Sequence, residues 1–170
     1  IVYYNTMAID LLLISAPLRP MEYPPMALAL LKSILHRNGY DVALSDASLE
    51  YWKHCGGTDS EFRIRTMPIQ NTVARTMEEI DASDFGVWTR AYVKRLLDKH
   101  QPRVVGISVF TYVSCLATYY MGRVIRELAP TGTRMLIGGF GAGSRLQYPE
   151  ALGAPSRDTL AETMRDEGTI

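Results

Sequence analysis

Short continuous apolar runs alternate along the chain with longer segments in which apolar residues recur every three or four positions. The continuous runs are residues 10–16, 41–46, 104–109 and 135–137. Runs of this length without polar alternation are typical of strands that are buried on both faces of a parallel sheet. The intervening segments have helical spacing, so the pattern predicts βαβ units with right-handed crossovers.

The first predicted helix begins near Pro25, which needs no backbone donor in a first turn, and ends at Gly39. Its expected core face contains Leu28, Leu31 and Leu35, alongside Ala27, Leu30 and Ile34.

Three later helices are expected. The first follows a cap at Ser83 or Asp84 and stops at Pro102, the next starts at Ser114, and the last covers 158–167. Their expected core positions are Phe85, Trp88, Tyr92 and Leu96; Ala117, Met121, Val124 and Leu128; and Thr159, Leu160, Thr163 and Met164.

Residues 49–83 show no sustained period and contain Gly56, Gly57 and Pro68. We interpret them as an irregular insertion with short helical pieces near 49–53 and 72–80.

These elements predict one α/β domain over residues 10–170, with a three-layer Rossmann-like (flavodoxin-like) parallel sheet in the order 2-1-3-4. Residues 1–9 are interpreted as an N-terminal extension, under the hypothesis that 1–6 derive from a vector and that Met7 is the natural start. The last strand would be an exposed apolar edge, which natural proteins avoid. We therefore expect a fifth strand beyond Ile170 and a longer parent protein.

The composition is that of a globular protein, with 47% hydrophobic and 21% charged residues. Eighteen basic and eighteen acidic residues leave no net field, which argues against nucleic acid as the main partner. No stretch has the length of a membrane span or the form of a signal peptide. Cys55 and Cys115 form no local pattern, so we interpret both as structural and expect a cytoplasmic protein.

Known catalytic motifs are missing. The turn after the first strand reads Ser-Ala-Pro-Leu-Arg-Pro (15–20) where a dinucleotide fold has G-x-G-x-x-G, and residues 139–143 have the wrong spacing. No G-x-S-x-G elbow occurs, and the three histidines (His36, His54 and His100) have no evident partners in sequence. We identify no catalytic residue and no metal site, and we interpret the chain as a binding domain.

The strands 104–109 and 135–137 each open into small or hydroxylated residues. Because parallel strands end at the same edge, these residues should form a crevice in which a ligand can approach the backbone closely.

The residues of this crevice resemble a known family. Gly106-Ile107-Ser108-Val109-Phe110 is similar to the corrinoid-domain strand end Gly-(Ile/Leu)-Ser with its S-x-L motif, although Phe110 replaces Leu. Leu136-Ile137-Gly138-Gly139 matches the later Gly-Gly strand end, and Pro24-Pro25 and residues 39–42 add to the likeness. The chain thus resembles the N-terminal cobalamin-binding domain of cobalamin-dependent radical S-adenosylmethionine enzymes.

The resemblance implies a pocket for the nucleotide tail of cobalamin between sheet and helices. Gly138 and Gly139 would let the flat base touch backbone, and Ser108 would donate to the tail. Hydroxyls beside a helix N-terminus would hold the tail phosphate, and aromatic residues would cover it. The implied residues of this part are Ser108, Phe110, Thr111, Tyr112, Ser114, Gly138, Gly139, Phe140 and Gly141.

The loop after the first strand departs from the D-x-H-x-x-G pattern of corrinoid methyl carriers, because residues 16–24 contain neither His nor Asp. By resemblance, cobalamin would be bound base-off without a histidine ligand, its lower face covered by the loop. The implied cover residues are Leu18, Arg19, Met21 and Tyr23, and Pro17 of the same loop is a further candidate cofactor-binding residue. Asp46 and Ser48 have two equally weighted interpretations. Either they contact the corrin amides, or they only end the second strand.

The C-x-x-x-C-x-x-C cluster motif of radical enzymes is absent here. The resemblance places it, with a 4Fe-4S cluster and S-adenosylmethionine, in a downstream barrel domain of the parent, which we expect to be a methyltransferase. Two other functions stay open: a structural or interaction domain without cofactor, and a nucleotide-binding domain.

Overall fold

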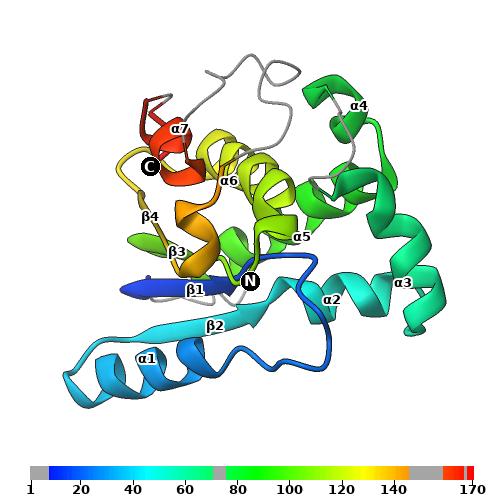
Figure 1. Ribbon diagram of the computed structural model, residues 1–170. Helices are drawn as coiled ribbons and strands as arrows, with labels where there is room; N and C mark the ends of the chain where they lie inside the picture. Colours follow the sequence, from blue (N-terminus) through cyan, green and yellow to red (C-terminus); the bar gives the residue numbers. More distant parts are fainter. Residues whose placement is uncertain (1–7, 71–75, 146–158, 167) are drawn as a thin grey trace, which may run out of the picture.

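The computed structural model describes residues 8–70, 76–145, 159–166 and 168–170, and its centre is a four-stranded parallel sheet (Figure 1). The strands are β1 (Leu11–Ser15), β2 (Val42–Asp46), β3 (Val104–Ser108) and β4 (Arg134–Gly138). Their order is β2-β1-β3-β4, which confirms the predicted order and the α/β class.

The register of the sheet sorts its residues onto two faces. Leu13, Gly106 and Leu136 lie side by side in one row, and Ser15, Ser108 and Gly138 lie side by side two residues further on. Because side chains alternate along a strand, both rows point to the same face. The residues between them point to the opposite face.

That opposite face is closed by α5 (Asp84–His100) and α6 (Cys115–Leu128), with α7 (Leu160–Asp166) packed on α6. Figure 1 shows these helices together on one side of the sheet. The predicted stripe of α5 is buried, Ser83 is its cap through Gly86 N–H, and the helix ends before Pro102. In α6 only Leu128 of the predicted face is exposed. We call this side the covered face.

The other face is covered only in part, by α1 (Met26–Arg37), which contacts β1 and β2. The apolar face predicted for α1 is largely wrong: Leu28 is buried, but Leu30, Leu31 and Ile34 are 64%, 41% and 48% exposed. The reason is physical, since no described element lies beside α1 over β3 and β4 to bury them. Pro25 is the N-cap of α1, and Gly39 follows its end with φ +85°.

The segment 49–83 was predicted to be irregular with short helical pieces near 49–53 and 72–80, and it is mostly helical where the structure describes it. A helix over 47–54 confirms the first piece, one over 77–81 overlaps the second, and one over 59–66 was not predicted. The helical elements are α2 (Ala47–His54), α3 (Asp59–Thr66), the 3-10 turn η1 (Met67–Ile69) and α4 (Met77–Asp81). Each α-helix is short and is started by a side-chain cap, from Asp46, Thr58 and Thr76 respectively. The predicted piece 72–80 lies partly outside the described residues, as does the start of the predicted 158–167 helix.

Candidate functional site

A groove of about 490 Å³ lies between α1 and the uncovered half of the sheet. Its floor is formed by β1, β3 and β4, through Leu13, Gly106, Ser108, Leu136 and Gly138. Its wall is one ridge of α1, made of residues four apart in the helix: Ala27, Leu31 and Leu35. The two strand ends that sequence reasoning singled out therefore meet in one groove.

The glycines at the end of β4 and in the following turn have different roles. A Cβ atom built on Gly138 meets nothing within 4 Å, so its missing side chain leaves the groove floor bare. A Cβ on Gly139 would lie 2.5 Å from the Val109 carbonyl oxygen, and Gly139 has φ +96°. A Cβ on Gly141 would also collide with the segment after β3. Gly139 and Gly141 therefore allow two loops to pack, while Gly138 opens the groove.

The loop after β3 lies against the glycine turn. Val109 donates its N–H to the Gly138 carbonyl (2.8 Å) and accepts from Gly141 N–H (3.0 Å). Thr111 and Ser114 hydroxyls are 3.3 Å apart, across the 3-10 turn η2 (Tyr112–Ser114) that precedes α6. Ser114 is fully buried and Thr111 half-buried, so of these two hydroxyls Thr111 is the accessible one.

Aromatic side chains stand exposed around the carboxyl edge of the sheet. The rings of Tyr23 and Phe110 lie 6.0 Å apart, which joins the loop after β1 to the loop after β3. Tyr112 is half exposed, and Phe140, in the 3-10 turn η3 (Phe140–Gly143), is 86% exposed. Exposed apolar groups gathered in this way mark interaction sites. We call Tyr23, Phe110, Tyr112 and Phe140 the aromatic rim.

The loop after β1 is fixed from inside the protein. The buried Arg19 guanidinium donates to the Asp46 carboxylate at 2.5 Å, and Arg19 N–H donates to the Ser48 hydroxyl at 2.7 Å. Ser48, fully buried, donates in turn to the Ala16 carbonyl. Asp46 also caps α2. Apart from the buried Nε of Arg19, which has no hydrogen-bond partner within the described residues, these polar groups already have partners, so they shape the loop and are not available to a ligand as they stand.

Two neighbouring residues of that loop are buried as well. Leu18 packs into the main core with a φ of +66°, a conformation that strains a non-glycine residue. Pro17 is also buried. Of the four predicted cover residues, only Tyr23 is exposed, whereas Met21 is partly buried and lines a separate hollow beside α3. The strain at Leu18 is sustained by its buried side chain and by the Arg19 contacts.

A polar cluster that sequence reasoning missed joins α2, α3 and α5. Asp84 accepts from Tyr51 Oη (3.2 Å) and Arg65 (3.4 Å), and it pairs with His54 Nε2 (3.0 Å). Burial raises the pKa of Tyr51 well above its usual range. Burial also acts to raise the pKa of Asp84, but its hydrogen bonds and the charge of His54 outweigh this and lower it. The cluster lies on the covered face, away from the groove, and clamps the three helices together.

Two further observations limit the kinds of site that the described residues can form. Within the described residues, no group of three or more His, Cys, Asp or Glu side chains is placed to hold a metal ion, and both cysteines are buried. The helices of the described part are all too short or too polar to cross a membrane.

Comparison of the chain with models of known protein families, with curated proteins and with solved structures gives no match. The features of this chain that point to a function are therefore the groove, its bare floor at Gly138 and the aromatic rim.

Proposed function

We propose that this domain binds a corrinoid, with the nucleotide tail in the groove and the macrocycle over the aromatic rim. One observation carries the proposal: the groove floor is bare backbone at its carboxyl end. The bare position there is Gly138, with Ser108 beside it in the register, whereas Gly106 lies two residues earlier on β3 and is covered by the Leu13 side chain. A flat, fused-ring base needs such a floor, because any Cβ would hold it away from the sheet.

The volume and lining of the groove suit the base of the tail. Its volume of about 490 Å³ is within the range of small-molecule sites, and Leu13, Leu28 and Leu31 provide apolar walls. The Ser108 hydroxyl, at the end of β3, is the polar group that the base or its ribose would meet. Thr111, beyond the end of β3, is available to the tail phosphate.

The rim supports the macrocycle. The rings of Tyr23 and Phe110 lie close together at the carboxyl edge of the sheet, and Phe140 is exposed in the turn that follows β4 at the same edge. A bound corrinoid would supply a cobalt centre able to carry a methyl group. From the loop after β1, the exposed Tyr23 would lie against the macrocycle, and residues 16–24 contain no histidine that could bind the cobalt.

The activity that we propose for this chain is corrinoid binding. The sequence resemblance implies partnership with a radical S-adenosylmethionine barrel and methyl transfer for a longer parent protein.

A comparison of two corrinoids tests the proposal. Hydroxocobalamin carries the nucleotide tail and diaquocobinamide lacks it, whereas both have the macrocycle. We expect cobalamin to bind at least tenfold more tightly, a difference of about 1.4 kcal/mol, in equilibrium dialysis followed by visible absorbance. Equal affinities would show that the tail is not in the groove, and binding of neither would overturn the proposal.

A further inference from the structure

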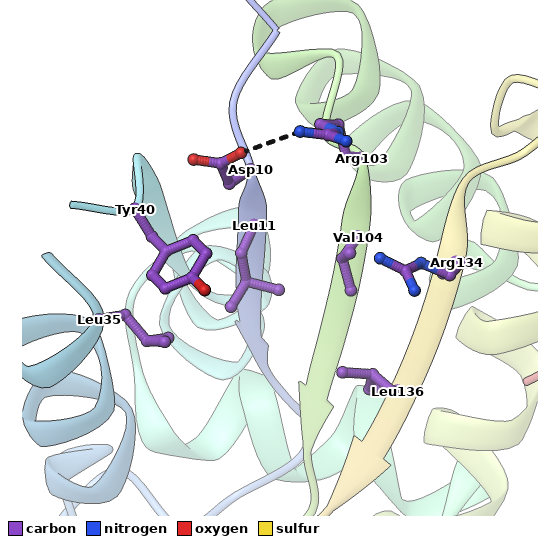
Figure 2. A pocket seen from close by; sticks show the side chains of 8 residues that line it. All are labelled: Asp10, Leu11, Leu35, Tyr40, Arg103, Val104, Arg134 and Leu136. Atoms are coloured by element: carbon purple, nitrogen blue, oxygen red, sulfur yellow. Dashed lines mark ion pairs between the residues drawn. The ribbon is translucent and has the colours of Figure 1, made fainter. Parts of the chain in front are cut away.

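We call the face of the sheet that α1 covers only in part the open face. Its amino half carries a second hollow, of about 320 Å³, which shares Leu11, Leu35 and Leu136 with the groove (Figure 2). Its floor is Leu11, Val104 and Leu136, and Leu35 and Tyr40 form the side nearest α1. Two guanidinium groups, Arg103 and Arg134, stand at the starts of β3 and β4. Unlike the carboxyl half, this half has side chains on its floor that a protein surface can contact.

The apolar surface extends beyond the hollow. On α1, the groove ridge of Leu31 and Leu35 continues around the helix into Leu30 and Ile34, which are exposed. Leu136, on the floor, is also exposed. A ligand confined to the hollow would leave Leu30 and Ile34 in water, so this surface fits an occupant of the size of a secondary-structure element.

The dimensions point to a helix. Neighbouring strands lie about 4.8 Å apart, so the middle of the uncovered pair, β3 and β4, lies about 10 Å from the middle of the pair that α1 covers, β1 and β2. This distance equals the spacing of about 8–10 Å at which helices pack. Five-residue strands extend about 17 Å, which corresponds to about 11 helical residues, or three turns.

The charges define its direction. Arg103 Nη1 lies 3.5 Å from Asp10 Oδ1, whereas no carboxylate among the described residues forms an ion pair with Arg134. Cations favour the C-terminal end of a helix. A helix antiparallel to the strands would place that end at Arg103 and Arg134. We infer that the open face between α1 and β4 docks an amphipathic helix from outside residues 1–170, antiparallel to the strands, with an acidic side chain in its last turn.

This helix would lie over the groove in which we place the nucleotide tail, because both use Leu35 and Leu136, so the two are alternative occupants of the open face. The two proposals can still fail separately, since the test of the helix uses the protein without corrinoid and the dialysis with corrinoid uses no peptide.

The probes are hydrocarbon-stapled 14-residue peptides with a Leu, Ile or Met stripe, made in pairs that carry Glu or Lys in the last turn. We expect the best Glu peptide to bind at least tenfold more tightly than its Lys partner in fluorescence anisotropy. Arg134→Glu should reverse this order, and Leu136→Asp should abolish binding by both. Leu128→Asp, an exposed leucine at the end of α6, is the matched control and should change neither affinity.

Orientation gives an independent readout. A spin label on the peptide C-terminus should broaden the amide signals of Thr133 and Arg134, and one on the N-terminus those of Gly138. The inference is overturned if no peptide of the set binds, if Lys peptides bind as well as Glu peptides, or if the broadening is reversed. The inference is also overturned if sedimentation shows that the protein is a dimer, and if this dimer is dissociated by Leu136→Asp but not by the peptides.

Discussion

The two faces of the sheet are made by the same four strands but are completed to different degrees. On β4, Met135 points into the covered face and is 6% exposed, whereas Leu136, the next residue, points to the open face and is 60% exposed. Among the described residues, the covered face contains the large apolar core, whereas the open face has a small buried cluster of Leu13, Leu28 and Val42, with Leu11, Leu35 and Leu44 partly buried against it. Stability therefore comes mainly from one face, and the other is left with surface available for binding.

The largest contrast should appear in a matched pair on β4. Met135→Ala should lower the free energy of unfolding by about 2–5 kcal/mol, because it leaves a cavity in the covered core. Leu136→Ala should change it by less than about 1 kcal/mol, because its side chain is already in water. Urea unfolding followed by circular dichroism measures both. Equal losses of unfolding free energy would mean that Leu136 on the open face is packed as tightly as Met135 on the covered face.

A second pair separates the two glycines at the end of β4. Gly139→Ala should destabilise the protein by about 1–3 kcal/mol, because it forces a strained positive φ and a collision with Val109. Gly138→Ala should leave the free energy of unfolding within about 0.5 kcal/mol of the wild type, because its Cβ meets open space. The same unfolding experiment applies. A stable Gly139→Ala protein would refute the close packing of the two loops.

The smallest effect is expected from pH, at the edge of the covered face. Hydrogen bonds from the Tyr120 hydroxyl and then from Arg90 lower the pKa of Asp81 from its ordinary value of 3.8. Because folding lowers this pKa, the stabilisation is present above pH 3.8 and is lost as the pH falls through the lowered value.

Asp81→Asn should therefore cost under about 1 kcal/mol at pH 7, since Asp81 is half exposed, and should flatten the loss of stability as the pH falls below 3.8. The check is a series of urea unfolding curves at several pH values. An unchanged pH dependence in the variant would exclude Asp81 as a source of acid sensitivity.

Much of the fold was predictable from the sequence, because each strand is a continuous apolar run and the stripe of Phe85 and Tyr92 has clear helical spacing. The helix α3 was missed because only Phe62 and Thr66 of its eight residues are buried, which is too few to produce a period. The exposure of α1 was missed for the opposite reason. Its apolar spacing is regular, but spacing does not tell whether a neighbour is present to bury it.

The candidate site was predictable only in part. Parallel register brings Ser108 beside Gly138, so their proximity followed from the strand pattern. The pairing of Arg19 with Asp46 joins residues 27 apart, and no local pattern reports it. The difference between Gly138 and Gly139 depends on the distance to Val109, which only the folded structure gives.

The central claim, that the bare groove floor at Gly138 receives the tail of a corrinoid, is tested most directly by equilibrium dialysis of hydroxocobalamin with Gly138→Val. The matched control is Thr131→Val, an exposed position in the turn before β4 at the opposite end of that strand. We predict at least tenfold weaker binding by Gly138→Val and wild-type binding by Thr131→Val, with both proteins folded by circular dichroism. Wild-type affinity in a folded Gly138→Val protein would contradict the claim.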